Sequence, residues 1–66
     1  MEINDVCNIK SFAPNKYEKG TVVKINTDSK NVRYVSVIYT VGYEATKTTM
    51  LPETEFIFKD NEYWQK

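Results

Sequence analysis

The sequence predicts a small all-β domain, and three observations point to it. β-branched and aromatic residues, which fit a pleated strand better than a helix, recur along the whole chain. The two glycines and two prolines stand between the strand-like segments. No segment spaces its apolar residues with the 3.6-residue period of an amphipathic helix. With 66 residues the chain has room for one domain, spanning 1–66, and one core.

Five segments are expected to form strands, and each is bounded by residues that favour turns. The expected strands are 5–11, 21–25, 32–41, 43–49 and 55–59. An irregular loop is expected over 12–20, and the polar cluster 28–31 predicts a turn because short polar side chains bond their own backbone. Gly42 favours a tight hairpin. Pro52 has no amide hydrogen to donate, so it should interrupt the pairing before the last strand.

The longest strand, 32–41, supplies the expected core. Its odd-numbered residues are the more apolar set, so a period of two turns them inward. The residues expected in the core are Val35, Val37, Tyr39, Leu51 and Phe56, faced by Ile25 and by Val22 or Val23. Five short strands bury such faces best by curling into a small barrel, which also removes most exposed strand edges.

This order of elements resembles the SH3-like small barrels, including their Tudor-like and KOW-like variants. The resemblance rests on the loop 12–20, the segment 20–25, the hairpin at Gly42, and Leu51-Pro52-Glu53 in the place of a single helical turn. It covers nearly the whole chain and implies a five-stranded SH3-like small barrel with a single helical turn before the last strand. The acidic loop and Trp-Trp pair of signalling SH3 domains and the Gly-rich loop of KOW motifs are absent. The resemblance therefore implies neither a proline-rich ligand nor RNA.

The composition predicts a cytoplasmic protein with no membrane partner. Cys7 is the only cysteine, so no internal disulfide can form. The first five residues carry acids where a signal peptide needs basic residues and then an apolar run. No apolar run approaches the length of a membrane helix. Lysine outnumbers arginine eight to one and asparagine is frequent, which is typical of AT-rich genomes such as those of many bacteria and their phages.

The inventory of reactive side chains predicts that the protein is not an enzyme. It has no histidine, the commonest general base and metal ligand. Cys7 has no imidazole partner and is expected to be a small buried hydrophobe. Two glycines cannot supply a Gly-rich phosphate loop. The acid pairs Glu53/Glu55 and Asp60/Glu62 resemble an acid/base dyad or a weak metal site, but isolated pairs are usually solvated charges. We expect no catalytic residue, no cofactor and no metal.

Partner binding is the remaining class of function. Nine aromatic residues are more than so small a core can hide, and tyrosine and tryptophan are enriched at interface hot spots. Charge is distributed unevenly, because 10–33 carries a net +4 whereas 1–9 and 34–66 carry −2 each. These regions either pair within the fold or form a bipolar surface that meets a charged partner. Tyr63 and Trp64 in the tail either cap the barrel or face a partner.

We therefore expect a module that docks on a larger host protein and occludes a site, as small phage accessory or inhibitor proteins do. The alternative is a nucleic-acid-binding barrel that uses the basic 10–33 segment and stacks bases on aromatic rings. A pI near 6.2 and a single arginine count against that alternative. A third interpretation is self-assembly into a homo-oligomer through an exposed strand edge. The candidate partner-binding residues are Tyr17, Tyr34, Tyr43, Lys16, Lys19 and Lys24.

Overall fold

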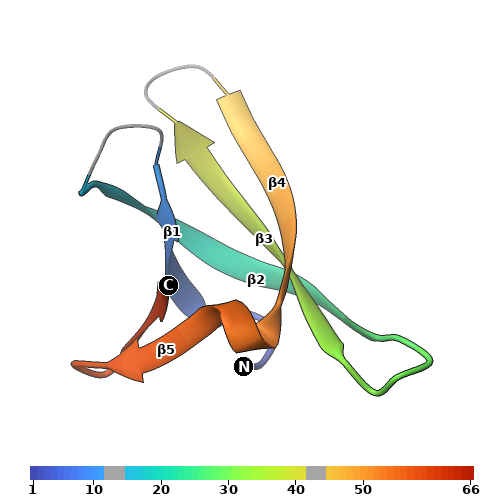
Figure 1. Cartoon of the computed structure of the whole chain (residues 1–66). Helices are drawn as coiled ribbons and strands as arrows, with labels where there is room; N and C mark the ends of the chain where they lie inside the picture. The colour runs from blue at the N-terminus through green and yellow to red at the C-terminus, as the bar shows by residue number, and fades with distance from the viewer. Residues whose placement is uncertain (12–14, 42–44) are drawn as a thin grey trace.

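The protein is all-β, as the sequence predicts. A computed structural model describes residues 1–11, 15–41 and 45–66, with the backbone alone for 41 and 45. Within these ranges the chain forms six strands and one 3-10 turn (Figure 1). In chain order they are β1 (Val6–Lys10), β2 (Tyr17–Thr27), β3 (Arg33–Val41), β4 (Ala45–Pro52), η1 (Glu53–Glu55), β5 (Phe56–Lys59) and β6 (Glu62–Gln65). No helix in the described ranges is long and apolar enough to cross a membrane.

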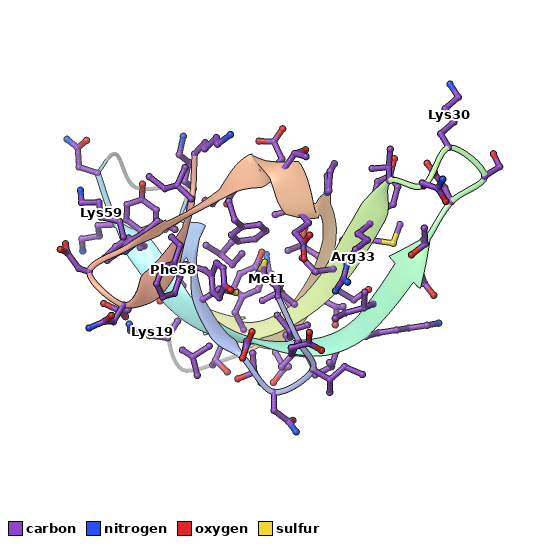
Figure 2. The ribbon with its side chains drawn as sticks, turned by 90° about the horizontal axis from the view of Figure 1, so that it is seen from below. Met1, Lys19, Lys30, Arg33, Phe58 and Lys59 are labelled. Carbon is purple, nitrogen blue, oxygen red and sulfur yellow. The ribbon has the colours of Figure 1, made fainter. Side chains whose placement is uncertain are left out.

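The strands form a single mixed sheet in the order β4-β3-β2-β1-β6-β5. Neighbouring strands run antiparallel except β1 and β6, which run parallel with Cys7 opposite Tyr63. The sheet is strongly curved, and Figure 2 looks into one end of it, where it curls around side chains such as Met1. The expected count of five strands is wrong, and the sheet is open, with β4 and β5 as its two edges.

The additional strand exists because the chain reverses tightly at Asp60-Asn61. Both residues have positive φ, 53° and 61°. Two left-handed residues in a two-residue loop are the signature of a type I′ turn, whose twist matches that of the flanking strands. Asparagine and aspartate tolerate this conformation better than other non-glycine residues. The segment 62–65 therefore pairs with β5 as β6 instead of trailing off as a tail.

Strand β2 begins earlier and runs longer than the sequence predicts. It starts at Tyr17, opposite Lys10 of β1, so 17–20, expected in the loop, belong to the strand. A bulge interrupts it, because Val22 lies opposite Val37 while Lys24 lies opposite Ser36, which leaves Val23 without a counterpart. Bulges bend a strand and increase its twist. β2 can therefore pair with β1 along its first half and with β3 along most of its length.

The core lies on the inner face of the curved sheet and matches the predicted alternation. The buried apolar residues are Cys7, Ile9, Val22, Val35, Val37 and Phe56, with Met1, Ile25, Tyr39, Leu51 and Tyr63 partly buried against them. Val22 rather than Val23 faces inward, and because the bulge shifts the alternation by one residue, Ile25 faces the same side as Val22. A Cβ on Gly20 would lie 2.4 Å from a methyl of Val37, so only glycine lets β2 pack this closely on β3.

Two predicted turns are confirmed. At 28–31 the carboxylate of Asp28 accepts hydrogen bonds from the backbone amides of Lys30 (2.8 Å) and Val32 (3.0 Å), as expected for a short polar side chain in a turn. Pro52 ends β4, but the strand runs past its expected end at 49, since 50–52 still pair with β3. The single helical turn η1 follows over Glu53–Glu55 rather than at Leu51-Pro52-Glu53. That turn precedes β5, which is not the last strand.

Candidate partner-binding surface

The face of the sheet opposite the core carries apolar side chains from four neighbouring strands. Residues opposite each other on adjacent strands share a face. One such row crosses β1 to β4 through Val6, Thr21, Ile38 and Thr48. Val6 and Ile38 in this row are exposed, and Met50 on β4 is 60% exposed.

Tyr34 belongs to this same face, because it alternates with the buried Val35 along β3. Its ring is half-buried, and Pro52 of β4 is its cross-strand neighbour. We call the set Val6, Val23, Tyr34, Ile38 and Met50 the outer apolar face. Lys24 is exposed on the same face, beside the bulge and opposite Ser36, which in turn lies opposite Met50.

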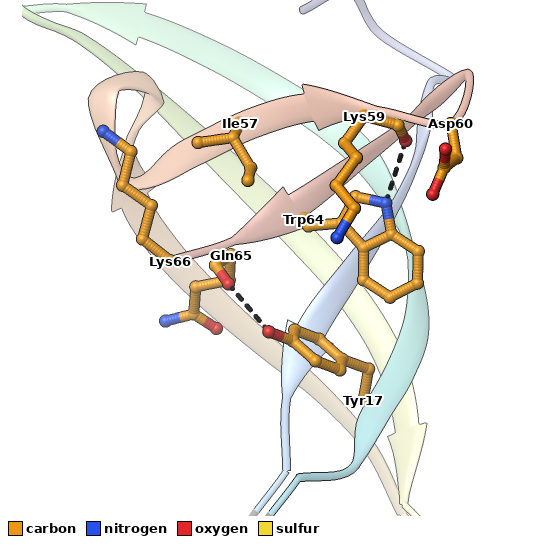
Figure 3. A pocket seen from close by; sticks show the side chains of 7 residues that line it. All are labelled: Tyr17, Ile57, Lys59, Asp60, Trp64, Gln65 and Lys66. Carbon is orange, nitrogen blue, oxygen red and sulfur yellow. Dashed lines mark hydrogen bonds between the residues drawn. The ribbon is translucent and has the colours of Figure 1, made fainter.

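A pocket opens on the same side of the sheet, near β5 and β6, with a volume of about 300 Å³. It is lined by Tyr17, Ile57, Lys59, Asp60, Trp64, Gln65 and Lys66 (Figure 3). These residues come from the start of β2 and from the β5–β6 hairpin, so the pocket exists only where the hairpin meets the rest of the sheet. We call it the aromatic pocket.

Two aromatic rings form one wall of the aromatic pocket. The centroids of Tyr17 and Trp64 lie 5.0 Å apart with the ring planes at 89°, an edge-to-face arrangement that aromatic pairs prefer. The Tyr17 hydroxyl donates to the carbonyl of Gln65 (3.3 Å), and the Trp64 indole N–H donates to the carbonyl of Lys59 (3.0 Å). Both bonds are drawn in Figure 3. The hydroxyl of Tyr17 and the indole N–H of Trp64 therefore have hydrogen-bond partners within the protein, and the two rings present apolar surface.

The rim of the aromatic pocket is cationic. Lys59 and Lys66 line it, and Asp60 is the one acidic side chain among the lining residues. Lys10, the cross-strand partner of Tyr17, and Lys16, its sequence neighbour, are exposed close by. The surface beside the two rings therefore favours a ligand that carries negative charge.

Lys19 is occupied by a contact within the protein. Its ammonium donates to the carboxylate of Glu62, which also lies 3.5 Å from the side-chain amide of Asn8. The hydrogen bond from Lys19 is the main reason why the pKa of Glu62 lies below its usual value. The same amide of Asn8 donates to the carbonyl of Tyr63 (2.9 Å), and Asn8 is only 3% exposed. These contacts attach β6 to β1 and β2.

The six predicted site residues therefore separate into different environments. Tyr17 lines the aromatic pocket with Lys16 nearby, Tyr34 and Lys24 lie at the outer apolar face, and Lys19 is bonded to Glu62. Tyr43 lies outside the described residues. The sequence interpretation missed Ile57 and Lys59 as parts of a site and left Trp64 undecided between cap and partner contact. The sequence feature that indicates these residues is the Asp60-Asn61 turn, because it folds the tail back against β5.

Cys7 and Glu53 are held in structural contacts. Cys7 is fully buried, and burial raises the pKa of its thiol to about 11, so the thiol is protonated at neutral pH. Glu53 accepts from the amino group of Met1 at 2.8 Å and lies 3.5 Å from the guanidinium Nε of Arg33. Within the described ranges, no three acidic or cysteine side chains are arranged to hold a metal ion.

Comparisons of the chain with family models, with curated protein sequences and with solved structures gave no match.

Proposed function

We propose that this protein is a non-catalytic module that binds a larger protein through the side of its sheet opposite the core. The outer apolar face carries the proposal. Isolated exposed apolar residues are normal, but contiguous ones on neighbouring strands are typical of interaction sites. Ile38 and Met50 lie on the adjacent strands β3 and β4, Val6 lies on β1 in the same cross-strand row as Ile38, and each of the three is more than a third exposed.

The proposal includes a mode of action. A domain of this size offers little room for chemistry, but it can cover a site on a larger cytoplasmic protein, as phage accessory and inhibitor proteins do. We also infer that the fold is a variant of the SH3-like small barrel, to which the β5–β6 hairpin adds a strand. The helical turn between β4 and β5 supports that assignment.

A pair of matched variants on β4 tests the proposal. Met50 and Thr46 lie on the same face of this strand and are both exposed. Met50→Asp places a charge in the outer apolar face, whereas Thr46→Asp places the same charge outside it. In affinity capture from nuclease-treated host lysate, we expect Met50→Asp to abolish retention of the partner and Thr46→Asp to preserve it. Equal retention by the two folded variants would contradict the proposal.

Nucleic-acid binding is the second candidate, and the lysines at the rim of the aromatic pocket are the observation that favours it. The basic 10–33 segment supports it less, because Figure 2 places Lys30 at the far end of the molecule from Lys19 and Lys59. Binding to a single-stranded oligonucleotide should fall steeply with salt if phosphates are neutralised. Replacing Lys16, Lys19 and Lys24 by glutamine should then flatten that slope. We expect only weak binding at physiological salt.

A further inference from the structure

We infer that the aromatic pocket is a second binding site, separate from the outer apolar face, and that it takes an acidic protein segment carrying one bulky aliphatic side chain. The inference rests on the proposed function in one respect, which is that the binding partner is a protein. Four features of the pocket lead to it: its apolar wall, its fixed geometry, its charge, and the angle between its two rings.

The apolar wall selects an apolar group. Ile57 is Trp64's cross-strand neighbour and is 43% exposed. Because the Tyr17 hydroxyl and the Trp64 N–H already donate to backbone carbonyls, the two rings offer a ligand chiefly carbon surface. An aliphatic side chain placed against Ile57 and the rings gains from burial without leaving a polar group unsatisfied.

The pocket is also formed before a ligand arrives. The two hydrogen bonds and the edge-to-face contact hold both rings in one arrangement. The hairpin itself is attached to β1, since Lys10 donates its backbone amide to the Gln65 side chain at 2.8 Å. A ligand therefore does not have to order these side chains, which lowers the entropic cost of binding.

The charge at the rim selects an anion. Lys59 and Lys66 flank the apolar wall, and the exposed Lys10 lies opposite Tyr17 on the same face of the sheet. In Figure 3, Asp60 lies on the far side of Trp64 from Ile57 and Lys66. Carboxylates on either side of a bound aliphatic group would meet lysines, and such complementarity raises both association rate and specificity.

The arrangement of the rings favours a protein over a nucleic acid. Single-stranded nucleic acids bind to aromatic faces that stack successive bases, along a continuous basic track. Tyr17 and Trp64 stand at 89° and form a corner, and a volume of about 300 Å³ suits one or two side chains. Lys19 is bonded to Glu62, and Lys30 lies at the opposite end, so the basic segment forms no continuous track there.

Trp64 makes the test specific, because it is the only tryptophan in the sequence. The probe is a synthetic nonapeptide with a central leucine and two glutamates on each side, in a serine and glycine background. The signal is the single indole N–H resonance of the ¹⁵N-labelled full chain. We expect a saturable shift of this resonance. Peptides with serine in place of leucine, or glutamine in place of the glutamates, should each bind about five- to tenfold more weakly.

Two variants locate the charge effect. Lys59→Glu reverses a charge at the rim but keeps the backbone carbonyl that accepts from Trp64, and Lys30→Glu makes the same change at the distant turn. We expect Lys59→Glu to weaken peptide binding about tenfold and Lys30→Glu to leave it unchanged. If Lys59→Glu does not fold, Lys66→Glu replaces it.

Three results would overturn the inference. They are no indole shift at millimolar peptide, equal effects of Lys59→Glu and Lys30→Glu, or a shift given by an oligothymidylate but not by the peptide. If the peptide gives no shift of the indole resonance while Met50→Asp still abolishes partner capture, the aromatic pocket is refuted as a site and the proposed function is not. If the peptide shifts the indole resonance but Met50→Asp does not reduce partner capture, the proposed function is refuted and the aromatic pocket is not.

Discussion

The central strands and the β5–β6 hairpin are held in the structure by different forces. The central strands carry Val22, Val35 and Val37, which are fully buried, so burial of apolar surface fixes their register. The hairpin contributes Phe56 and the partly buried Tyr63 to the core, and its second strand is attached in addition by polar contacts from Asn8, Lys10 and Lys19. The comparison indicates that apolar burial determines the fold, whereas hydrogen bonds position the aromatic pocket.

Two phenylalanines on β5 give the largest expected difference. Phe56 is 8% exposed in the core, and Phe58, two residues on, is 62% exposed with an edge-to-face contact to Tyr63. Phe56→Ala should cost about 3–5 kcal/mol in the free energy of unfolding, enough to unfold a domain this small. Phe58→Ala should cost about 0.5–1.5 kcal/mol. Urea denaturation followed by far-UV circular dichroism measures both, and equal costs would show that β5 is placed incorrectly.

Asn8→Asp tests whether polar contacts attach the hairpin. The substitution replaces the buried amide donor by a carboxylate, which faces the carbonyl of Tyr63 and the acid of Glu62. We expect a loss of about 2–3 kcal/mol, since a buried acceptor is left without a donor. Hydrogen exchange should speed up in β6 first, with β2 and β3 protected longer.

Asn26→Asp is the matched control, because Asn26 is exposed on β2. It should change stability by less than about 0.5 kcal/mol. A uniform rise of exchange across all strands in Asn8→Asp would mean that the hairpin and the central strands unfold as one unit.

The smallest expected effect is a dependence of the free energy of unfolding on pH in the acid range. The pKa of Glu62 is lowered in the folded protein from its ordinary value of 4.5, so the carboxylate binds protons less readily when folded. Its contribution to stability is therefore present above that ordinary value and is lost as pH falls through the folded pKa. Unfolding measured against pH for the wild type and Glu62→Gln should show a difference that shrinks in acid. A constant difference would indicate that the Lys19 contact does not depend on charge.

Much of the fold could be predicted from local patterns. The alternation along β3 identified Val35 and Val37 as core residues, and Asp28 and Pro52 marked real boundaries. The choice between Val22 and Val23 stayed open because a bulge shifts the alternation, and its position depends on the partner strand.

The features that were missed depend on contacts between distant parts of the chain. The polar run Tyr17-Glu18-Lys19 was interpreted as a loop, but it pairs with β1. Lys19, a predicted partner-binding residue, pairs with Glu62, 43 residues away, and no local pattern indicates this contact. The turn at Asp60-Asn61 lacks the glycine that marks most such hairpins, so β6 was not predicted. The function itself stays a prediction, and the partner variants test it.

The parallel pairing of β1 with β6 has a consequence for how the protein matures. Asn8 lies opposite Trp64, so this pairing joins residues near the two ends of the sequence. Contacts between residues so distant in sequence are slow to form, because the entropy of loop closure must be overcome before they add stability. The wall of the aromatic pocket is completed only by that step. A chain still leaving the ribosome, or one that has lost β6, would carry the outer apolar face without the aromatic pocket, and would leave the edge of β1 open to pairing with another chain.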